Sequence, residues 1–150
     1  MTKTLKTPRG NNMKLYIAGK LCNDSELEFL EKITKICEDK GFETFLPHRD
    51  VGPCKDITDV ERIFKGDIQE GFKNCRGVVA VLDGLHVGAG TAWELGYAYA
   101  KGIPVVGLKT DEPIEEALDY LSPIIIASTK IVKTLEELEN ELEKMKEKNE

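Results

Sequence analysis

Short apolar runs alternate with amphipathic, helix-like segments along almost the whole chain, and this alternation restricts the fold more than any other feature. The runs expected to form strands are residues 14–18, 42–46, 77–82, 103–107 and 130–132. Runs of this length, bounded by turn residues and separated by helical patterns, are typical of strands joined by crossover helices. Such crossovers require a parallel sheet, here of about five strands.

The segments between the runs carry helix-start signals. Capping boxes occur at Ser25-x-x-Glu28, Thr58-x-x-Glu61 and Thr134-x-x-Glu137. The helix expected from residue 58 to about residue 74 has apolar residues at helical spacing, which predicts an inner face made of Val60, Ile63, Phe64, Ile68 and Phe72. Residues 124–126 fit either a strand or a continued helix.

The handedness of crossover connections favours one topology. It is a doubly wound, flavodoxin-like sheet of order 2-1-3-4-5 with helices on both faces. Ligands bind such sheets at the carboxyl edge, where the strand order reverses between the first and third strands. The loops leaving those strands are residues 19–23 and 83–90. This topology brings Tyr16, Asp83 and Glu94 toward one crevice.

The segment from Gly88 to Ala98 follows the third predicted strand and opens a helix through a glycine-rich turn. Thr91-x-x-Glu94 has the spacing of a capping box, and the pattern alone favours that structural role over a catalytic one. A carboxylate at such a position can also perform covalent or acid/base chemistry. Free N–H groups at the helix start suit a phosphate or carboxylate and are expected to keep Glu94 ionised.

Composition restricts the class of partner. The 150 residues fit one domain, predicted over residues 13–150, and the polar composition of residues 1–12 predicts a flexible extension. A net charge of −6 argues against a nucleic-acid-binding surface. The four cysteines form no Cys-x-x-Cys motif, so we expect free thiols in a reducing cytoplasm. No apolar stretch is long enough to span a membrane, and no signal peptide is evident.

Several short motifs carry a resemblance to a known family. In chain order they are Tyr16-Ile-Ala-Gly19, Phe45-Leu-Pro-His-Arg-Asp50, Ile63-Phe-Lys-Gly-Asp67, Val81-Leu-Asp-Gly84 and Gly90-Thr-Ala-Trp-Glu-Leu-Gly-Tyr-Ala98. Together they resemble the nucleoside 2-deoxyribosyltransferases over roughly residues 13–142. The resemblance implies an enzyme that breaks the N-glycosidic bond of a 2′-deoxynucleoside and passes the sugar to another nucleobase. It also implies a homo-oligomer in which a neighbouring subunit helps to complete each site.

The resemblance assigns roles to three residues. Glu94 matches the nucleophile, Asp67 the second acid near the base, and Tyr16 the phenol that positions the nucleophile. The chemistry is consistent with these residue types, because a close carboxylate can stabilise an oxocarbenium-like transition state and then trap the sugar as an ester. Protonation of the departing base by a second acid makes that base a better leaving group. This mechanism needs no metal or cofactor.

Two departures from the family pattern concern the 5′ end of the sugar. Gly88 stands where the transferases carry an aspartate that contacts the 5′-hydroxyl, and Ser122 stands where they carry an asparagine from a neighbouring subunit. A glycine N–H does not repel a 5′-phosphate, a serine hydroxyl can donate to one, and Lys20 can supply a counter-charge. Gly88-x-Gly90-Thr-x-x-Glu94 also resembles the core of nucleotide phosphoribohydrolases. The alternative is therefore a 2′-deoxynucleoside 5′-monophosphate N-hydrolase.

The remaining substrate-binding predictions are weaker. His48 and Arg49 can line the base pocket or fix Asp67, but a solvated loop pair is about as common. Asp83 and Gly19 are also predicted at the substrate site. For Asp83, orienting the glycine loop through backbone hydrogen bonds is slightly favoured over a part in the chemistry. Gly19 belongs to the first glycine loop. A non-catalytic nucleotide-binding module on the same scaffold is a third hypothesis.

Overall fold

The computed structural model describes residues 13–149, so the predicted extension at residues 1–12 lies outside the described residues. Its sheet has five strands, all parallel, in the order β2-β1-β3-β4-β5. The strands are β1 (Lys14–Ala18), β2 (Glu43–Phe45), β3 (Cys75–Val81), β4 (Val105–Leu108) and β5 (Lys130–Val132). The predicted flavodoxin-like fold is confirmed, and the strand order reverses between β1 and β3, as expected.

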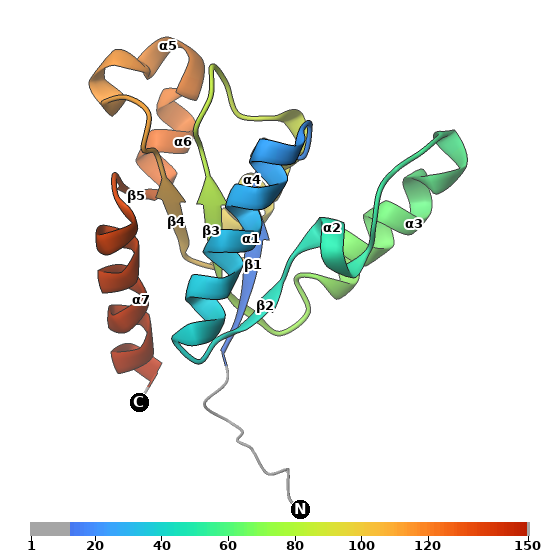
Figure 1. Cartoon of the computed structure of the whole chain (residues 1–150), viewed down its shortest axis with the longest axis horizontal. Helices are drawn as coiled ribbons and strands as arrows, with labels where there is room; N and C mark the ends of the chain where they lie inside the picture. Colours follow the sequence, from blue (N-terminus) through green and yellow to red (C-terminus); the bar gives the residue numbers. More distant parts are fainter. Residues whose placement is uncertain (1–12, 150) are drawn as a thin grey trace, which may run out of the picture.

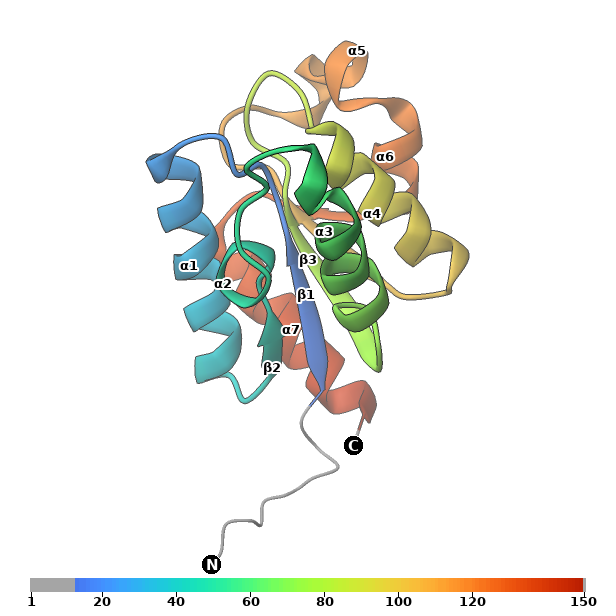
Figure 2. The ribbon, with the colours of Figure 1, turned by 90° about the vertical axis from the view of Figure 1, so that its right-hand side faces the viewer.

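Helices cover both faces of this sheet (Figures 1 and 2). They are α1 (Asp24–Asp39), α2 (Pro47–Asp50), α3 (Val60–Phe64), α4 (Ala89–Ala100), α5 (Leu118–Leu121), α6 (Pro123–Ser128) and α7 (Leu135–Asn149), with short 3-10 turns at Ile57–Asp59 (η3) and Ile114–Glu116 (η5). In Figure 2, α1 and α7 lie on one side of β1 and β3, and α3 and α4 lie on the other. Within residues 13–149, no helix is both long and apolar enough to cross a membrane.

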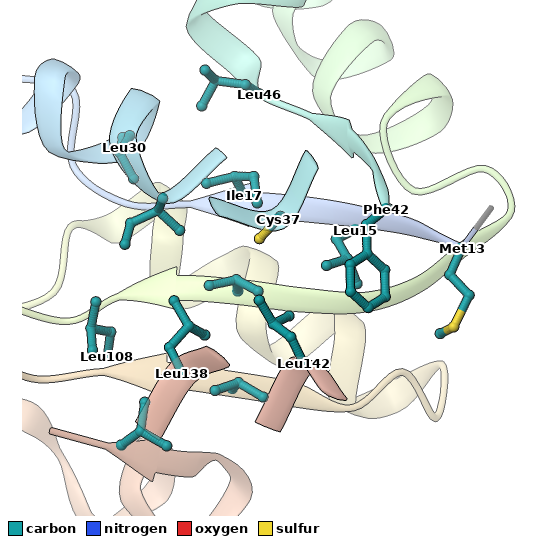
Figure 3. Close-up of a cluster of buried hydrophobic side chains, with 14 residues drawn as sticks. Met13, Leu15, Ile17, Leu30, Cys37, Phe42, Leu46, Leu108, Leu138 and Leu142 are labelled. Atoms are coloured by element: carbon teal, nitrogen blue, oxygen red, sulfur yellow. The ribbon is translucent and has the colours of Figure 1, made fainter. Parts of the chain in front are cut away.

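One core lies between the sheet and the α1–α7 layer. Leu15 and Ile17 point from β1 into it, because alternate side chains of a strand face opposite sides of the sheet. Leu30 of α1 and Leu138 of α7 meet them there (Figure 3). These side chains are almost fully buried, so this face is occupied by packing rather than by a ligand site.

A second core lies on the other face of the sheet, under residues 65–72 and α4, and it contains the phenol ring of Tyr16. Tyr16 pairs in the sheet with Phe45 of β2 and Val78 of β3. Its ring stacks on Phe72 with centroids 4.2 Å apart and on Phe45 at 5.4 Å. A centrally placed strand residue thus reaches from the core toward the helices that carry the candidate acids.

Two helix starts differ from the predicted capping boxes. Asn23, not Ser25, caps α1, because its side chain accepts the Glu26 N–H at 2.9 Å. Asp56, not Thr58, caps the 3-10 turn before α3. In both cases an Asx side chain two residues upstream satisfies the free N–H groups first. Thr134 does cap the start of α7 and accepts the Glu137 N–H at 3.1 Å.

The helix expected over residues 58–74 is not uniform. After α3 the chain forms a π-helix, η4 (Lys65–Glu70), closed by a bond from the Gly71 N–H to the Gly66 carbonyl at 2.9 Å. A Cβ atom on Gly71 would lie 2.8 Å from both Tyr16 Cε2 and Phe45 Cε1. The wider turn therefore depends on a glycine that lets the helix approach these rings. The ambiguous residues 124–126 are helical, within α6.

Candidate active site

Glu94 and Tyr16 are joined by a short hydrogen bond. The Tyr16 hydroxyl donates to Glu94 Oε2 at 2.6 Å across 78 positions of sequence. Helix α4 begins at Ala89 with Gly88 as its N-cap, so Glu94 lies in the second turn, and Thr91 is buried inside the first. The capping-box interpretation of Thr91 and Glu94 is therefore wrong, because the helix starts two residues before Thr91.

The carboxyl of Glu94 is protonated more readily than an ordinary glutamate. Its pKa is raised to about 7, mainly by burial and also by the nearby Asp67, against the opposing effect of the Tyr16 hydrogen bond. The helix start was expected to keep Glu94 ionised, but burial opposes this, so the carboxyl is only partly ionised near neutral pH. Burial and the Glu94 charge raise the pKa of Tyr16 far above its usual range, so the phenol remains a proton donor.

Asp67 lies on the π-helix η4 and faces the same cavity as Glu94. Burial raises its pKa to about 6, against the opposing charge of Arg62. Its Oδ1 is buried and has no hydrogen-bond partner among the described residues. Buried polar atoms are normally paired, so an unpaired carboxyl oxygen facing a cavity is the pattern expected where a ligand supplies the partner.

The cavity that holds both acids has a volume of about 460 Å³ and largely apolar walls. Its lining residues are Cys54, Val60, Ile63, Phe64, Asp67, Ile68, Ala89, Gly90, Trp93 and Glu94. Phe64 and Trp93 meet edge to face, with centroids 6.0 Å apart. A few polar groups in an apolar, aromatic pocket suit a flat heterocycle with ionisable ring nitrogens.

The predicted inner face of α3 is partly wrong for this reason. Val60 and Phe64 were expected in the core but are 48% and 46% exposed. Helical spacing correctly groups them on one side of the helix, and that side faces the cavity instead of packed side chains. Ile68 and Phe72, later on the same segment, are buried as expected.

The glycine loops surround Lys20. A Cβ atom on Gly88 would lie 3.3 Å from Lys20 Cγ, and one on Gly84 would lie 2.9 Å from Lys20 Nζ. The Lys20 ammonium is 3.9 Å from Glu26, a loose ion pair. Gly19 is enclosed by apolar side chains of the α1 face, with the nearest atom from Leu30. Lys20 therefore lies beside the start of α4, next to the residue at which the family pattern departs.

Asp83 is engaged within the protein. Its two carboxylate oxygens accept the backbone N–H of Thr110 at 2.6 Å and the Thr110 hydroxyl at 2.5 Å. The adjacent Gly84 N–H donates to Asp111, and the Gly84 carbonyl accepts from the buried ammonium of Lys109. Asp83 thus fastens the loop after β3 to the loop after β4, which matches the favoured expectation of an orienting role.

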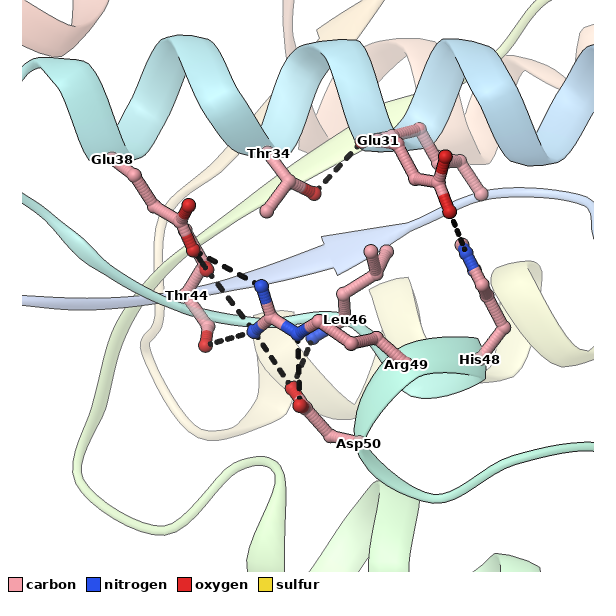
Figure 4. A network of polar contacts seen from close by, with 9 residues as sticks. Glu31, Thr34, Glu38, Thr44, Leu46, His48, Arg49 and Asp50 are labelled. Carbon is pink, nitrogen blue, oxygen red and sulfur yellow. Dashed lines mark hydrogen bonds and ion pairs between the residues drawn. The ribbon is translucent and has the colours of Figure 1, made fainter.

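His48 and Arg49 are not brought to the acid pair. His48 contacts Glu31 of α1 at 3.1 Å, and Arg49 contacts Glu38 of α1 at 3.0 Å (Figure 4). Arg49 also donates to both carboxylate oxygens of its neighbour Asp50. In this chain the two residues tie α2 to α1, and neither contacts Asp67 through any bond that the described residues make.

Ser122 starts α6 with a positive φ of 80°, and its side-chain oxygen accepts the Ile124 N–H at 3.2 Å. It is absent from the residues that line the acid cavity, whereas Gly90 belongs to that lining. Sequence reasoning did not single out Arg62, which donates to backbone carbonyls beside the cavity. In the sequence, the one indication of a role for Arg62 was its position five residues before Asp67.

Comparison with known proteins gives a family and a set of similar structures. The sequence matches the family model described as nucleoside 2-deoxyribosyltransferase over residues 15–145. No curated protein matches it. A conserved protein from Enterococcus faecalis V583 is 30% identical, with a TM-score of 0.69 over 89% of this chain and 99% of that one.

Two further solved structures are similar. A 2-deoxyribosyltransferase from Bacillus psychrosaccharolyticus is 26% identical, with a TM-score of 0.62 over 85% of this chain and 90% of that one. The CMP N-glycosidase BcmB of Clostridium botulinum is 19% identical, with a TM-score of 0.55 over 88% of this chain and 97% of that one. At that identity the last similarity shows the fold alone.

Proposed function

The chain belongs to the nucleoside 2-deoxyribosyltransferase family, and from this premise we propose that it cleaves the N-glycosidic bond of 2′-deoxynucleosides and transfers the deoxyribosyl group to another nucleobase. The observation that carries the proposal is the pair of buried carboxyl groups at one apolar cavity, with Tyr16 bonded to one of them. The family and the similar structures support the broader class of glycosyl-transferring or N-glycosidase enzymes.

In the first half-reaction, a carboxylate oxygen of Glu94 forms a bond to the anomeric carbon. The bond between that carbon and the base nitrogen breaks, and its electron pair leaves with the base. Asp67 donates its proton to the departing base, so the base leaves neutral. In the second half-reaction, a nitrogen of another base attacks the anomeric carbon, the ester oxygen of Glu94 leaves, and the proton of the incoming base returns to Asp67.

Tyr16 positions the nucleophile in this scheme. Its hydroxyl hydrogen bond holds one oxygen of Glu94 and leaves the second free to face the sugar. The ring cannot swing away, because it is stacked between Phe45 and Phe72 in the core. A carboxylate fixed in this way loses little orientational freedom when it reacts.

A second candidate is supported by one observation at the start of α4. Gly88 places no side chain at the start of α4, and the side chain of Lys20 lies next to Gly88. A phosphate on the sugar would meet backbone N–H groups and a cation there, in place of a carboxylate. This favours hydrolysis of 2′-deoxynucleoside 5′-monophosphates, with water in place of the acceptor base.

The test is to incubate the purified protein with deoxyadenosine or with deoxyadenosine 5′-monophosphate, each with and without an acceptor base. Chromatography follows the free base and any new nucleoside. Exchange of bases on the free nucleoside supports transfer. Release of base from the monophosphate alone overturns it in favour of the hydrolase, and binding without turnover of either substrate favours the non-catalytic module.

The nucleophile is tested separately. Glu94→Gln is expected to lose activity by at least about a thousandfold while the protein stays folded. Mass spectrometry of the wild-type protein, quenched during turnover without acceptor, is expected to find a deoxyribosyl adduct on the peptide that contains Glu94. Full activity in Glu94→Gln would exclude the covalent mechanism.

A further inference from the structure

One side chain, which the proposed mechanism does not use, fastens a segment that contributes Cys54 to the lining of the acid cavity. Arg62 of α3 donates from Nη1 to the Val51 carbonyl at 2.7 Å and from Nη2 to the Pro53 carbonyl at 2.9 Å. It also pairs with Asp59 at 3.4 Å. The planar guanidinium presents its N–H groups in a fixed fork, so one side chain holds two carbonyls in a defined arrangement.

Residues 51–59, which we call the arm, are held by this fork, by bonds from the Val51 and Gly52 N–H groups to the Pro47 carbonyl, and by an internal bond from the Lys55 N–H to Asp59 at 2.8 Å. In Figure 1 it runs between α2 and α3 and projects away from the sheet. Residues 53–58 are all exposed, and Ile57 is 79% exposed. Cys54 from the arm and Val60 just after it line the cavity. A segment that buries so little depends on a few polar contacts for its position.

The same guanidinium acts on the second acid of the site. Arg62 lies five residues before Asp67 on the continuous helical segment, and its positive charge lowers the pKa of Asp67 against the larger effect of burial. The other titratable groups near that carboxyl are Glu94 from α4 and Tyr16 from β1, whose titrations are both affected by the Asp67 charge. Among these groups, Arg62 is the cation.

We propose that Arg62 is a positioning residue with two separable roles: its fork holds the arm at the edge of the cavity, and its charge keeps Asp67 ready to exchange its proton with the base. The proposal rests on the proposed function, because the arm matters only if the cavity takes the base. Neither role requires Arg62 to touch the reacting atoms.

Two variants separate the roles. Arg62→Lys keeps the charge but cannot hold two carbonyls at once, so KM is expected to rise, with a loss in kcat/KM on the order of tenfold and an unchanged pH profile. Arg62→Met removes both the charge and the two hydrogen bonds. We therefore expect the same loss in kcat/KM together with an upward shift of the limb of the pH profile that lies near pH 6. The control is Lys65→Met. Lys65 is exposed and lies one turn away, so this variant removes an equal charge and leaves the Arg62 hydrogen bonds intact.

A second readout does not depend on turnover. Trp93 is the single tryptophan of the chain and lines the cavity beside Asp67, so its fluorescence reports the ionisation of the neighbouring carboxyl groups. The midpoint of the Asp67 step of this titration, near pH 6, is expected to move upward in Arg62→Met and to stay in place in Arg62→Lys and Lys65→Met. This holds even if the substrate class were different.

The outcomes are decisive in either direction. Wild-type KM in Arg62→Lys would overturn the clamping role, and an unmoved midpoint in Arg62→Met would overturn the electrostatic role. An equal shift in Lys65→Met would assign the effect to general surface charge and overturn the specific role of Arg62. Thermal unfolding of each variant confirms that a folded protein was measured. Failure of the wild-type protein to release base would count against the proposed function and not against the fluorescence result.

Discussion

At the scale of single residues, the candidate active site includes a side chain that belongs to the core. Tyr16 is fully buried in the middle of the sheet, yet its hydroxyl reaches the carboxyl of Glu94. The stacked rings fix the phenol, the phenol fixes the carboxyl, and burial keeps the carboxyl partly protonated near neutral pH. Each of these links can be broken by one substitution.

The pH dependence of activity follows from the two acids. In the proposed mechanism the productive form has Glu94 ionised and Asp67 protonated, although Glu94 has the higher pKa, about 7 against about 6. This form is a minority at every pH, and its population is largest between those two values. We expect kcat/KM to rise up to about pH 6 and to fall above about pH 7.

The control for this profile is Asp67→Asn. Activity is expected to fall by 10² to 10⁴, a typical contribution of a general acid. The loss at alkaline pH should disappear, because only the ionisation of Glu94 then matters. A wild-type profile that keeps rising to pH 9 would contradict the assigned roles.

Tyr16→Phe tests the hydrogen bond without disturbing the stack. The bond lowers the pKa of Glu94, so its removal is expected to move the limb near pH 7 upward and to lower kcat by about 10- to 100-fold. The free energy of unfolding should change by no more than about 1 kcal/mol, because a phenyl ring fills the same space. Tyr97→Phe, in the same aromatic cluster, is the matched control and should retain activity.

At the scale of secondary-structure elements, the π-helix η4 is the feature most closely tied to the site, because it carries Asp67. Such turns occur often at functional sites. A methyl group at Gly71 would collide with the backbone carbonyl of Asp67 and with the rings of Tyr16 and Phe45. Gly71→Ala is therefore expected to destabilise the fold by about 1–3 kcal/mol and to lower activity at temperatures where the protein remains folded.

The comparison variant for this prediction is Gly96→Ala. Gly96 is an exposed helical position of α4, and a Cβ atom there meets nothing within 4 Å. This variant should be neutral or more stable by up to about 1 kcal/mol. Chemical denaturation measures both. Equal stability of the two variants would show that the close approach at Gly71 is not needed.

The strands were predictable because their apolar runs are short, continuous and bounded by turns. The strand order followed from the handedness of crossovers, and the placement of Tyr16 near Glu94 followed from that order. The π-helix was not predictable, because its close approach to rings from β1 and β2 is a tertiary contact that the local sequence pattern does not encode. The role of Val60 and Phe64 was missed, since periodicity identifies the inner side of a helix but not whether a cavity lies against it.

Other parts of the site depend on contacts that no local pattern encodes. The sequence places His48 and Arg49 next to each other, but their bonds to α1 arise from tertiary packing. The clamp formed by Arg62 is equally non-local in effect, because it acts on carbonyls 11 and 9 positions earlier. The resemblance to the family supplied the roles of the acids, which composition and spacing alone left open.

At the scale of the whole molecule, the outer face of α4 is apolar although it is exposed. Tyr99 of α4 is 68% exposed, and Ile124 of α6 is 80% exposed. Large exposed apolar side chains on neighbouring helices favour self-association. We predict a homo-oligomer, which light scattering would detect as a mass above 16.8 kDa. Tyr99→Lys should shift the population toward monomer, and a monomer at every concentration would contradict the prediction.

The two acids also make the stability of the fold depend on pH. Their pKa values in the folded protein, about 6 and 7, exceed the ordinary values of 3.8 and 4.5. The folded protein therefore binds more protons than the unfolded chain between about pH 4 and 7, and the free energy of unfolding falls as pH rises through that window. Above pH 7, Glu94→Gln should be more stable than the wild type by on the order of 1–3 kcal/mol.

Thermal unfolding at pH 5 and pH 8 measures this difference. Glu147→Gln, at an exposed position of α7, is the control and should change neither value appreciably. A Glu94→Gln variant that melts below the wild type at pH 8 would show that the buried carboxylate is compensated by contacts other than the Tyr16 hydroxyl.

The buried acid pair has a consequence for the history and the engineering of such a protein. Charge held in an apolar cavity is tolerated only as long as the rest of the fold has stability to spare. A selection for heat-resistant descendants at neutral pH would therefore enrich variants that have lost one of the two acids. Unless activity is also selected at every round, the surviving variants are expected to be stable proteins without catalytic activity.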